Sequence, residues 1–488
     1  MKQHLRNLLF SNQTLGQTVL KNTFWLSVSQ LLHRLIKVVV VIYAARVLGA
    51  AGYGVFSYAI ASAGFMTMFS NIGIETILIK ESVQKPHLSS NYLSTTFFIK
   101  LILLALLSVL IIGVIPLINK VPGVEELLPV VAVILVLDGL RGFGFSLFRS
   151  LEQMETEAGI NVFTGIAIVV AAMMVLFFLP TPYYLAVAYA IGSALGLIAT
   201  IYAARNYLKS LWSHFTKELV RPILIATWPL ALIGMVGLIM LYTDTLMLGW
   251  MGTAQDLGLY TAAQKPLQFL VVIPTLVGAS ILPALSRLVN KNQPNFKALL
   301  EQALAIVMLI ALPIATTGII LSSDIIALLY GADYASSVLV FRVFMLSLLV
   351  TFPGTIVGQA VIALGEQQKF LKYIVLGALT NVALNAYLIP LWGIFGAATA
   401  TFLAQLAAQG IIYYQIRSRV GFMLLPKIGR IIGATAIIGI ILIGLQQLGI
   451  NIIVSLGIAA LIYLPLLIIM RDPSISALKS ILLPKRAE

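Results

Sequence analysis

Long apolar runs, separated by short polar segments, occupy nearly the whole chain. Each run is long enough to cross the roughly 30 Å hydrocarbon core of a bilayer as an α-helix. The pattern predicts fourteen membrane spans, at residues 22–48, 53–79, 92–118, 125–148, 159–179, 183–205, 223–250, 257–285, 297–322, 333–364, 370–389, 393–416, 427–447 and 450–470. Because the linkers are short, the sequence predicts an all-α polytopic membrane protein with no extramembrane domain.

Composition strengthens this prediction and excludes several kinds of chemistry. Of the 488 residues, 60% are hydrophobic and 10% charged, and the mean hydropathy is +1.02. Cysteine is absent, which excludes disulfides, iron–sulfur clusters and thiolate nucleophiles. The four histidines lie far apart without metal-binding spacing, so we expect no metal and no cofactor. The net charge of +14 reflects basic cytoplasmic loops, and we expect no nucleic-acid partner.

Lys and Arg residues predict the orientation in the membrane. With both termini in the cytoplasm, 24 of the 31 basic residues fall on the cytoplasmic side and one, Lys120, falls outside. Such a bias follows the positive-inside rule. We therefore expect a multi-pass protein of a bacterial or archaeal plasma membrane with both chain ends in the cytoplasm.

An internal repeat predicts two lobes. The junction of spans 1 and 2, residues 48–59, shares its Leu-Gly pair, second glycine, aromatic and final alanine with residues 248–263 at the junction of spans 7 and 8. Six spans separate the copies, so the two halves point the same way. The predicted segments are an amphipathic N-terminus (1–21), an N-lobe (22–205), a cytoplasmic linker (206–222), a C-lobe (223–418), a peripheral pair of spans (419–470) and a cytoplasmic tail (471–488).

Span 1 carries the strongest candidates for a binding site. Arg34 and Lys37 lie near its middle, on the same helical face as Ser27 and Gln30. A cation at the centre of a membrane helix costs about 2.5–3.5 kcal/mol even on a lenient insertion scale. Two on one stripe indicate a polar interior that an anionic ligand visits.

Other ionisable residues within the predicted core are few, and several have a structural explanation. Asp138 and Arg141 lie three apart, so an intrahelical ion pair is favoured. Glu75 could pair with Lys80 or Arg141. Arg46 lies near the outer surface, where extension of its side chain toward the headgroups (snorkelling) is favoured over ligand binding. For Lys100, snorkelling and ligand binding are equally supported.

The second lobe offers further candidates. Lys265, with Gln268 on one face of span 8, and Arg342 in span 10 could converge on the same ligand as the span 1 cations. Asp244 in span 7, the repeat partner of span 1, is a candidate for ion pairing or for a coupling ion. Amides and hydroxyls in spans 11 and 12 suit sugar hydroxyls, and helix-to-helix hydrogen bonds explain them equally well.

Short motifs distributed along the chain resemble those of bacterial lipid-linked oligosaccharide flippases. Residues 45–54 read ARVLGAAGYG, similar to the family's opening ARxLGxxxYG, and residues 71–74 read NIGI at the position of its xxGL. Residues 242–249 (YTDTLMLG) with 258–263 (GLYTAA) are similar to its second-half motif, and residues 389–398 (IPLWGIFGAA) to its IPxxGxxGAA. These Wzx-like proteins belong to the multidrug/oligosaccharidyl-lipid/polysaccharide exporter superfamily.

The resemblance implies a V-shaped, two-lobed transporter that works by alternating access. It also implies a cationic cavity and a lipid-tail groove beside the extra helix pair. Its ligand would be an undecaprenyl-pyrophosphate-linked oligosaccharide, turned from the inner to the outer leaflet for cell-surface polysaccharide export. Pathway glycosyltransferases and a polysaccharide polymerase are the expected partners, together with membrane lipids. The related lipid II flippases carry a denser run of arginines after the position of Arg34, where this chain has Val38–Val41, so a polysaccharide-type substrate is favoured.

Two other classes of function are weaker. A multidrug or organic-cation antiporter of the same superfamily needs acidic residues in its cavity and usually has twelve spans. A membrane-embedded glycan polymerase or ligase normally has a large outer loop with catalytic residues, which this sequence lacks. We therefore expect a transporter with no catalytic residues.

Overall fold

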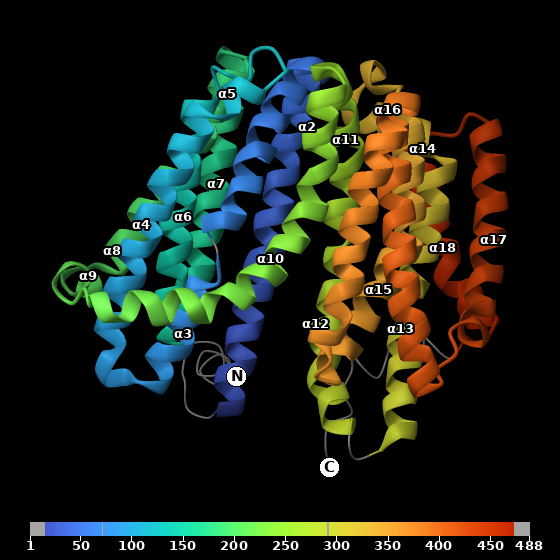
Figure 1. Cartoon of the computed structure of the whole chain (residues 1–488). Helices are drawn as coiled ribbons and strands as arrows, with labels where there is room; N and C mark the ends of the chain where they lie inside the picture. The colour runs from blue at the N-terminus through green and yellow to red at the C-terminus, as the bar shows by residue number, and fades with distance from the viewer. Residues whose placement is uncertain (1–14, 71, 290–291, 473–488) are drawn as a thin grey trace, which may run out of the picture. The chain divides into compact units, whose positions relative to one another are not determined.

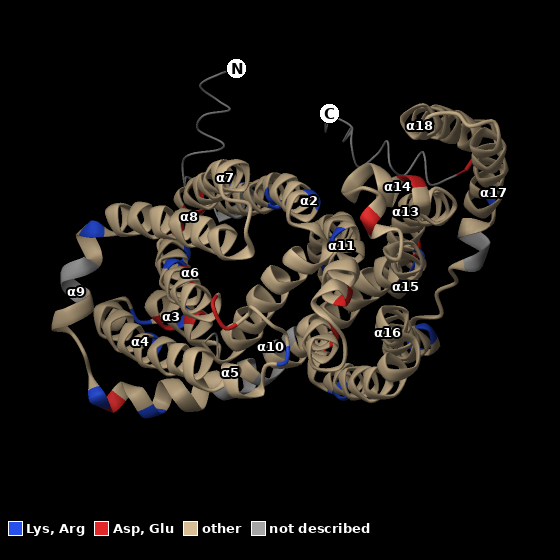
Figure 2. Ribbon diagram, turned by 90° about the horizontal axis from the view of Figure 1, so that it is seen from above, with Lys and Arg blue, Asp and Glu red and all other residues tan. Residues whose placement is uncertain are grey.

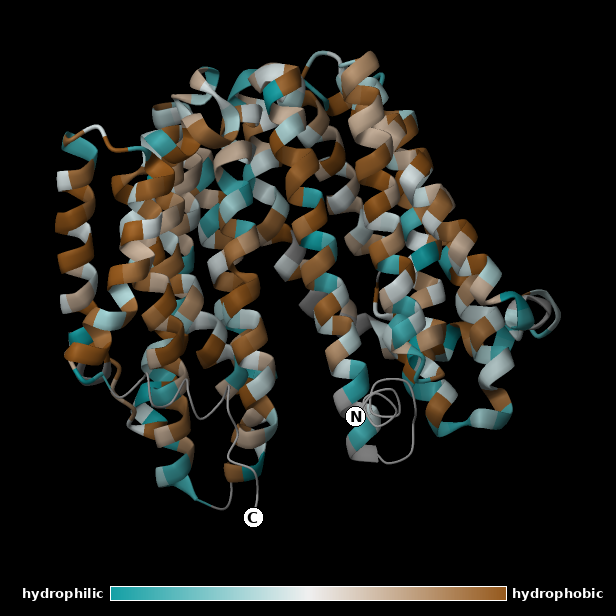
Figure 3. Cartoon of the chain, turned by 180° about the vertical axis from the view of Figure 1, so that it is seen from behind, coloured by the Kyte–Doolittle hydropathy of each residue, from teal (hydrophilic) through white to brown (hydrophobic). Residues whose placement is uncertain are grey.

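The computed structural model describes residues 15–70, 72–289 and 292–472. Within these ranges the regular secondary structure is entirely helical, and eleven helical segments are long and apolar enough to cross a membrane. An all-α polytopic membrane protein is therefore confirmed. Charged residues are sparse along the helices (Figure 2), and apolar residues dominate their length (Figure 3).

The described chain divides into two compact units, Met1–Gly258 and Leu259–Glu488. The first unit contains α2 (Leu15–Ser70), α3 (Ile74–Gln84), α4 (Ser89–Gly113), α5 (Ile115–Ile118), α6 (Leu128–Ser150), α7 (Met154–Phe178), α8 (Pro182–Ala203), α9 (Leu208–Ser213), α10 (Lys217–Met251) and the start of α11 (Ala254–Leu270) (Figure 1). The second contains the rest of α11, then α12 (Val272–Leu288), α13 (Gln293–Ile320), α14 (Ser322–Tyr330), α15 (Ser337–Ala363), α16 (Gln367–Val420), α17 (Leu425–Gln447) and α18 (Ile452–Ile469).

Several predicted segments remain predictions. The proposed six-helix lobes at 22–205 and 223–418 are not the same division as the two compact units, which part at Gly258. Most of the predicted N-terminal interfacial segment, residues 1–14, lies outside the described residues, and Leu15–Lys21 form the first turns of α2. Most of the predicted tail, residues 473–488, also lies outside them.

Two of the candidate spans are far longer than a bilayer requires. Lys21–Gln84 covers 64 residues and Gln367–Val420 covers 54. Within them, α2 and α16 each contain one non-helical glycine, Gly49 with φ 66° and Gly393 with φ 55°. A side chain in this left-handed region is strained, so glycine is the residue that lets the chain turn there. The predicted breaks at 48–53 and 389–393 thus fall on real interruptions of α2 and α16.

The core of the first unit lies among α3, α4 and α6. Ile74 and Leu78 of α3 pack with Tyr92 of α4 and with Phe143 and Phe148 of α6, and each of these side chains is buried. Burying an apolar side chain of this size contributes about 1.5–3 kcal/mol. This packing holds α6, which carries the charged pair described below, in a fixed position beside α2, α7 and α8.

In the second unit, α15 contacts α12, α13 and α16, while α17 packs against α13 and α18. The hydroxyl of Tyr463 in α18 donates a hydrogen bond to the carbonyl oxygen of Leu309 in α13, at 2.8 Å. The two last helices are therefore attached to the second unit chiefly through α13.

Candidate functional site

The predicted cations of span 1 lie in the first half of α2. Arg34 and Gln30 are exposed, and Lys37 is partly buried. The ammonium nitrogen of Lys37 lies 6.0 Å from the ring centroid of Tyr189 in α8, within range of a cation–π interaction. In the described part of the chain, Arg34 makes no hydrogen bond or ion pair. Arg34 is therefore available to a ligand.

Helix α6 contributes a charged pair. Arg141 Nη2 lies 3.0 Å from Asp138 Oδ1, so the predicted intrahelical ion pair is confirmed. The side chain of Arg141 is 11% exposed and that of Asp138 is 40% exposed. Within the described residues, Nε and Nη1 of Arg141 are buried and have no hydrogen-bond acceptor. A buried guanidinium with unused donors is costly, because desolvation is not repaid by hydrogen bonds.

Helices α2 and α6 bring these charges together. The charges of Asp138 and Arg141 both act on Lys37 and on His33, which lies one helical turn before Lys37. His33 is held in place by α7, where Nδ1 lies 3.0 Å from the carbonyl oxygen of Asn161. We call His33, Lys37, Asp138 and Arg141 the N-terminal charge cluster. Its two cations, Lys37 and Arg141, face one carboxylate, with the His33 ring beside them, so the cluster is suited to an anionic ligand.

Two members of this neighbourhood were missed by sequence reasoning. His33 was set aside because the histidines are far apart, although its spacing of four from Lys37 places both on one helical face. Gly165 in α7 also accommodates this ring, since a Cβ there would lie 2.9 Å from His33 Nδ1. Tyr189 had no sequence signal, because its approach to Lys37 depends on how α8 packs against α2.

The sequence-based pairings of Glu75 were wrong. Glu75 of α3 pairs with Lys100 of α4, Nζ to Oε1 3.2 Å, rather than with Lys80 or Arg141. Lys100 also donates to the carbonyl oxygen of Ser70 at 3.0 Å and is fully buried, so it does not snorkel. The pair joins two helices and makes both residues structural.

Removing one partner of this pair should destabilise the first unit. In Lys100→Met, Glu75 keeps its charge without a cation beside it. We expect a loss of up to about 3 kcal/mol of unfolding free energy, less than for a fully buried pair because the Glu75 side chain is 27% exposed. The double variant K100M/E75Q should recover most of the loss. Chemical unfolding in detergent micelles measures both, and equal stability of K100M and wild type would contradict the assignment.

Asp244 is buried in α10, at 1% exposure. It takes part in a hydrogen bond or electrostatic interaction with the rest of the protein. Each of the three predicted anionic residues thus has a partner in the folded chain: Glu75 with Lys100, Asp138 with Arg141, and Asp244 within its own surroundings.

The candidates of the second unit form two small groups. Lys265 donates to Gln268 Oε1 at 3.4 Å, and Gln268 donates to Gln264 Oε1 at 3.0 Å, so the predicted polar face of α11 is present. Arg342 is exposed, and its Nε donates to Ser322 Oγ at 2.7 Å. Their convergence with Arg34 and Lys37 remains a prediction.

Several amide and hydroxyl groups of spans 11 and 12 are used inside the bundle. Asn381 donates to Thr401 Oγ1 at 3.1 Å, and Thr351 of α15 donates to Gln405 Oε1 at 3.3 Å. These bonds support helix-to-helix attachment.

Comparisons with known proteins agree with this picture. A family model described as "Polysaccharide biosynthesis protein" matches residues 19–289. The "Probable flippase AglR" of Haloferax volcanii is 32% identical over 167 residues, 33% of this chain and 35% of that protein. A Shigella flexneri protein described as "Putative O-antigen transporter" is 24% identical over 400 residues, covering 78% of this chain and 93% of that protein. The matched segment thus spans about a third of the archaeal relative and nearly all of the bacterial one.

Solved structures show the same fold at low sequence identity. The lipid II flippase MurJ in an inward closed conformation is 17% identical with a TM-score of 0.74, and the match covers 91% of this chain and 98% of that one. An inward-facing multidrug resistance MATE family transporter is 14% identical with a TM-score of 0.64, covering 80% and 94%. Since the family model matches more than half of the residues, the chain belongs to the polysaccharide biosynthesis protein family, a family of membrane transporters and not of enzymes, and it shares its fold with the MurJ and MATE structures.

Proposed function

We propose that this chain is a flippase that moves undecaprenyl-pyrophosphate-linked oligosaccharides from the inner to the outer leaflet of a bacterial or archaeal plasma membrane. Alternating access would carry each glycan across for export to the cell surface. Glycosyltransferases of the same pathway would supply the lipid-linked glycan and a polysaccharide polymerase would consume it. The family membership and the flippase and O-antigen transporter relatives support this class of substrate.

The proposed topology has fourteen spans with both termini in the cytoplasm. Interruptions at Gly49 and Gly393 divide the two longest candidates into pairs. Helix α10, with 35 residues, is long enough to add one more. The predicted arrangement of two six-span lobes with α17 and α18 at the periphery is part of this proposal.

The observation that carries the proposed substrate is the unused hydrogen-bonding capacity of Arg141. Its Nε and Nη1 are buried without acceptors in the described chain, near the Lys37 ammonium and the His33 ring. Guanidinium N–H groups are strong donors to phosphate oxygens. A pyrophosphate, with two or three negative charges, would satisfy these donors. Arg34 and Lys37, with Gln30, are the proposed ligands beside it, and Lys265, Gln268 and Arg342 are proposed from the other half.

An organic-cation antiporter is the alternative. Its substrate would need a carboxylate that the protein leaves free. Glu75 and Asp138 are held in ion pairs, and Asp244 is engaged by the surrounding protein. This occupation of the acidic candidates favours an anionic ligand over a cationic one.

Ligand-induced stabilisation of the purified protein tests the proposal. Undecaprenyl diphosphate should raise the unfolding temperature in detergent micelles, because a ligand at a hundredfold excess over its Kd adds about 2.7 kcal/mol to stability. Undecaprenol, which has the same tail without phosphate, should have little effect. A lipophilic cation such as ethidium is the third arm. Stabilisation by the cation but not by the diphosphate would overturn the flippase in favour of the antiporter.

A further inference from the structure

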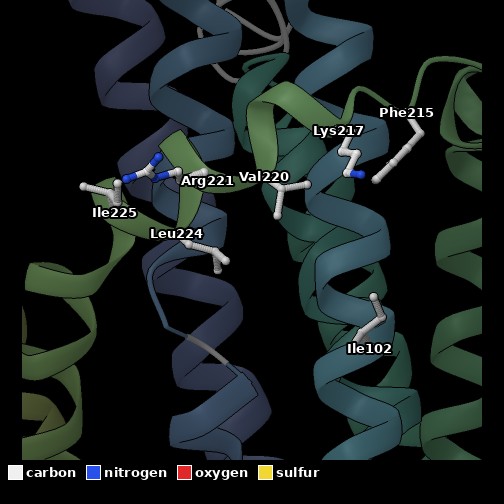
Figure 4. A pocket seen from close by; sticks show the side chains of 7 residues that line it. All are labelled: Ile102, Phe215, Lys217, Val220, Arg221, Leu224 and Ile225. Atoms are coloured by element: carbon white, nitrogen blue, oxygen red, sulfur yellow. The ribbon is translucent and has the colours of Figure 1, made fainter.

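A groove of about 950 Å³ lies on the first unit, apart from the N-terminal charge cluster. It is bounded by α4, through Ile102, and by the first three turns of α10 (Figure 4). Figure 1 shows that α10 begins with a segment running across the first unit before it turns to run beside α2. The groove therefore follows a helix segment that crosses the direction of its neighbours, as interfacial helices do.

Polar and aromatic contacts fix the two walls of the groove. The side-chain amide of Asn91 in α4 donates to Thr216 Oγ1 at 2.9 Å, and the backbone N–H of Thr216 donates to Thr95 Oγ1 at 3.1 Å. The rings of Phe98 and Phe215 lie 5.3 Å apart, nearly perpendicular. The two residues just before α10, Phe215 and Thr216, thus attach its start to α4, so the groove is built into the fold.

The lining combines an apolar surface with two cations. Ile102, Val220 and Leu224 supply apolar surface, and Ile102 is 68% exposed. Lys217 and Arg221 lie four residues apart, so both project from one face of α10. Both are exposed and make no ion pair in the described chain, and no acidic side chain lines the groove. In Figure 4 the two cations flank Val220, with Lys217 next to Phe215 and Arg221 next to Ile225.

The exposed aromatic residues nearby place this groove at a membrane surface. Trp212 is 66% exposed, and Trp side chains concentrate at the boundary between headgroups and acyl chains, while the neighbouring Phe215 is 48% exposed. By the proposed topology this boundary is the cytoplasmic one. Inorganic phosphate would use the cations but not the apolar wall, whereas a phospholipid would use both.

We propose that this groove binds an anionic glycerophospholipid of the cytoplasmic leaflet, with its phosphate at Lys217 and Arg221 and an acyl chain along Ile102, Val220 and Leu224. The inference rests on the proposed topology and is independent of the proposed substrate. A basic residue near the surface favours an anionic lipid about fivefold. The pair therefore predicts a preference of about 25-fold over a zwitterionic lipid.

Native mass spectrometry of the delipidated full-length protein measures this preference, with phosphatidylglycerol and phosphatidylcholine of matched chains as probes. Wild type should bind phosphatidylglycerol about 25-fold more tightly, and K217Q/R221Q should bind the two lipids equally. A matched control, K80Q/K372Q, removes two exposed lysines elsewhere and should retain the preference. Equal binding of both lipids by wild type, or an unchanged preference in K217Q/R221Q, would overturn the proposal.

A second variant distinguishes binding of the whole lipid from binding of its phosphate headgroup alone. Ile102→Trp with Leu224→Trp fills the apolar part while both cations remain, and both positions are exposed, so folding should be retained. We expect it to lower the affinity for phosphatidylglycerol at least tenfold. Glycerol phosphate, which lacks acyl chains, should not compete with phosphatidylglycerol. Competition by glycerol phosphate together with undiminished lipid binding by the double-Trp variant would indicate a simple anion site and refute the lipid site.

Discussion

Replacing Arg141 by Gln should lower glycan export at least tenfold while the protein still folds and inserts. The substitution removes the donors Nε and Nη1 that have no acceptor in the described chain, and it removes one positive charge beside Lys37 and His33. Hydrogen bonds to charged groups contribute about 1.5–3 kcal/mol each, and 1.4 kcal/mol corresponds to a factor of ten. Complementation of a flippase-deficient strain, with export followed by surface glycan staining, measures the effect.

Two companion variants separate ligand binding from other roles of the pair. Arg141→Lys keeps the charge but loses the planar fork, so export should be intermediate. Asp138→Asn frees the guanidinium from its only ion pair in the described chain, so export should be retained and the diphosphate should stabilise the protein at least as well as in wild type. If Asp138 carried a coupling proton instead, D138N would abolish export. Wild-type export by R141Q would remove Arg141 from the proposed site.

Local spacing explains which parts of the site could be predicted from sequence. Asp138 and Arg141 are three residues apart on one helix, so their pairing follows from helical geometry alone. Glu75 and Lys100 lie 25 residues apart in different helices, and their pairing depends on how α3 packs against α4. Lys80 is close to Glu75 in the sequence, whereas Arg141 and Lys100 both lie in other predicted spans, so spacing along the chain does not distinguish these two from each other.

The helices themselves were predictable because membrane spans are set by length and hydropathy. The ends of the helices are harder to predict from the sequence. The predicted span 53–79 is interrupted after Ser70, and α3 begins at Ile74, preceded by Gly73 with φ 84°. Hydropathy does not register such a turn, since Ile72 and Ile74 on either side are apolar. The same limitation applies to α10, whose change of direction depends on what it crosses.

The internal repeat predicts that Gly54 and Gly258 correspond. In the structure both glycines lie where α2 and α11 cross each other. A Cβ on Gly54 would lie 1.8 Å from the carbonyl oxygen of Ala254, and a Cβ on Gly258 would lie 1.8 Å from that of Ala50. Each helix thus presents a small-xxx-small pair, Ala50 with Gly54 and Ala254 with Gly258, which lets two backbones approach closely. The two repeat copies pack against each other reciprocally at this crossing.

Gly258→Ala should therefore be among the most damaging single-methyl substitutions in the chain. The obstructing atoms belong to the backbone of α2, so no rotamer change relieves the clash and the helices must separate. We expect a loss of about 1–3 kcal/mol, the usual cost of overpacking, and at least a tenfold fall in export. Gly54→Ala should cause a similar loss of stability and export.

Gly159→Ala is the matched control. Gly159 is an exposed helical glycine with open space around it, so alanine there should be neutral or stabilising by up to about 1 kcal/mol. Unfolding in detergent and the export assay measure all three variants, and G258A with the stability and activity of G159A would show that the crossing tolerates separation.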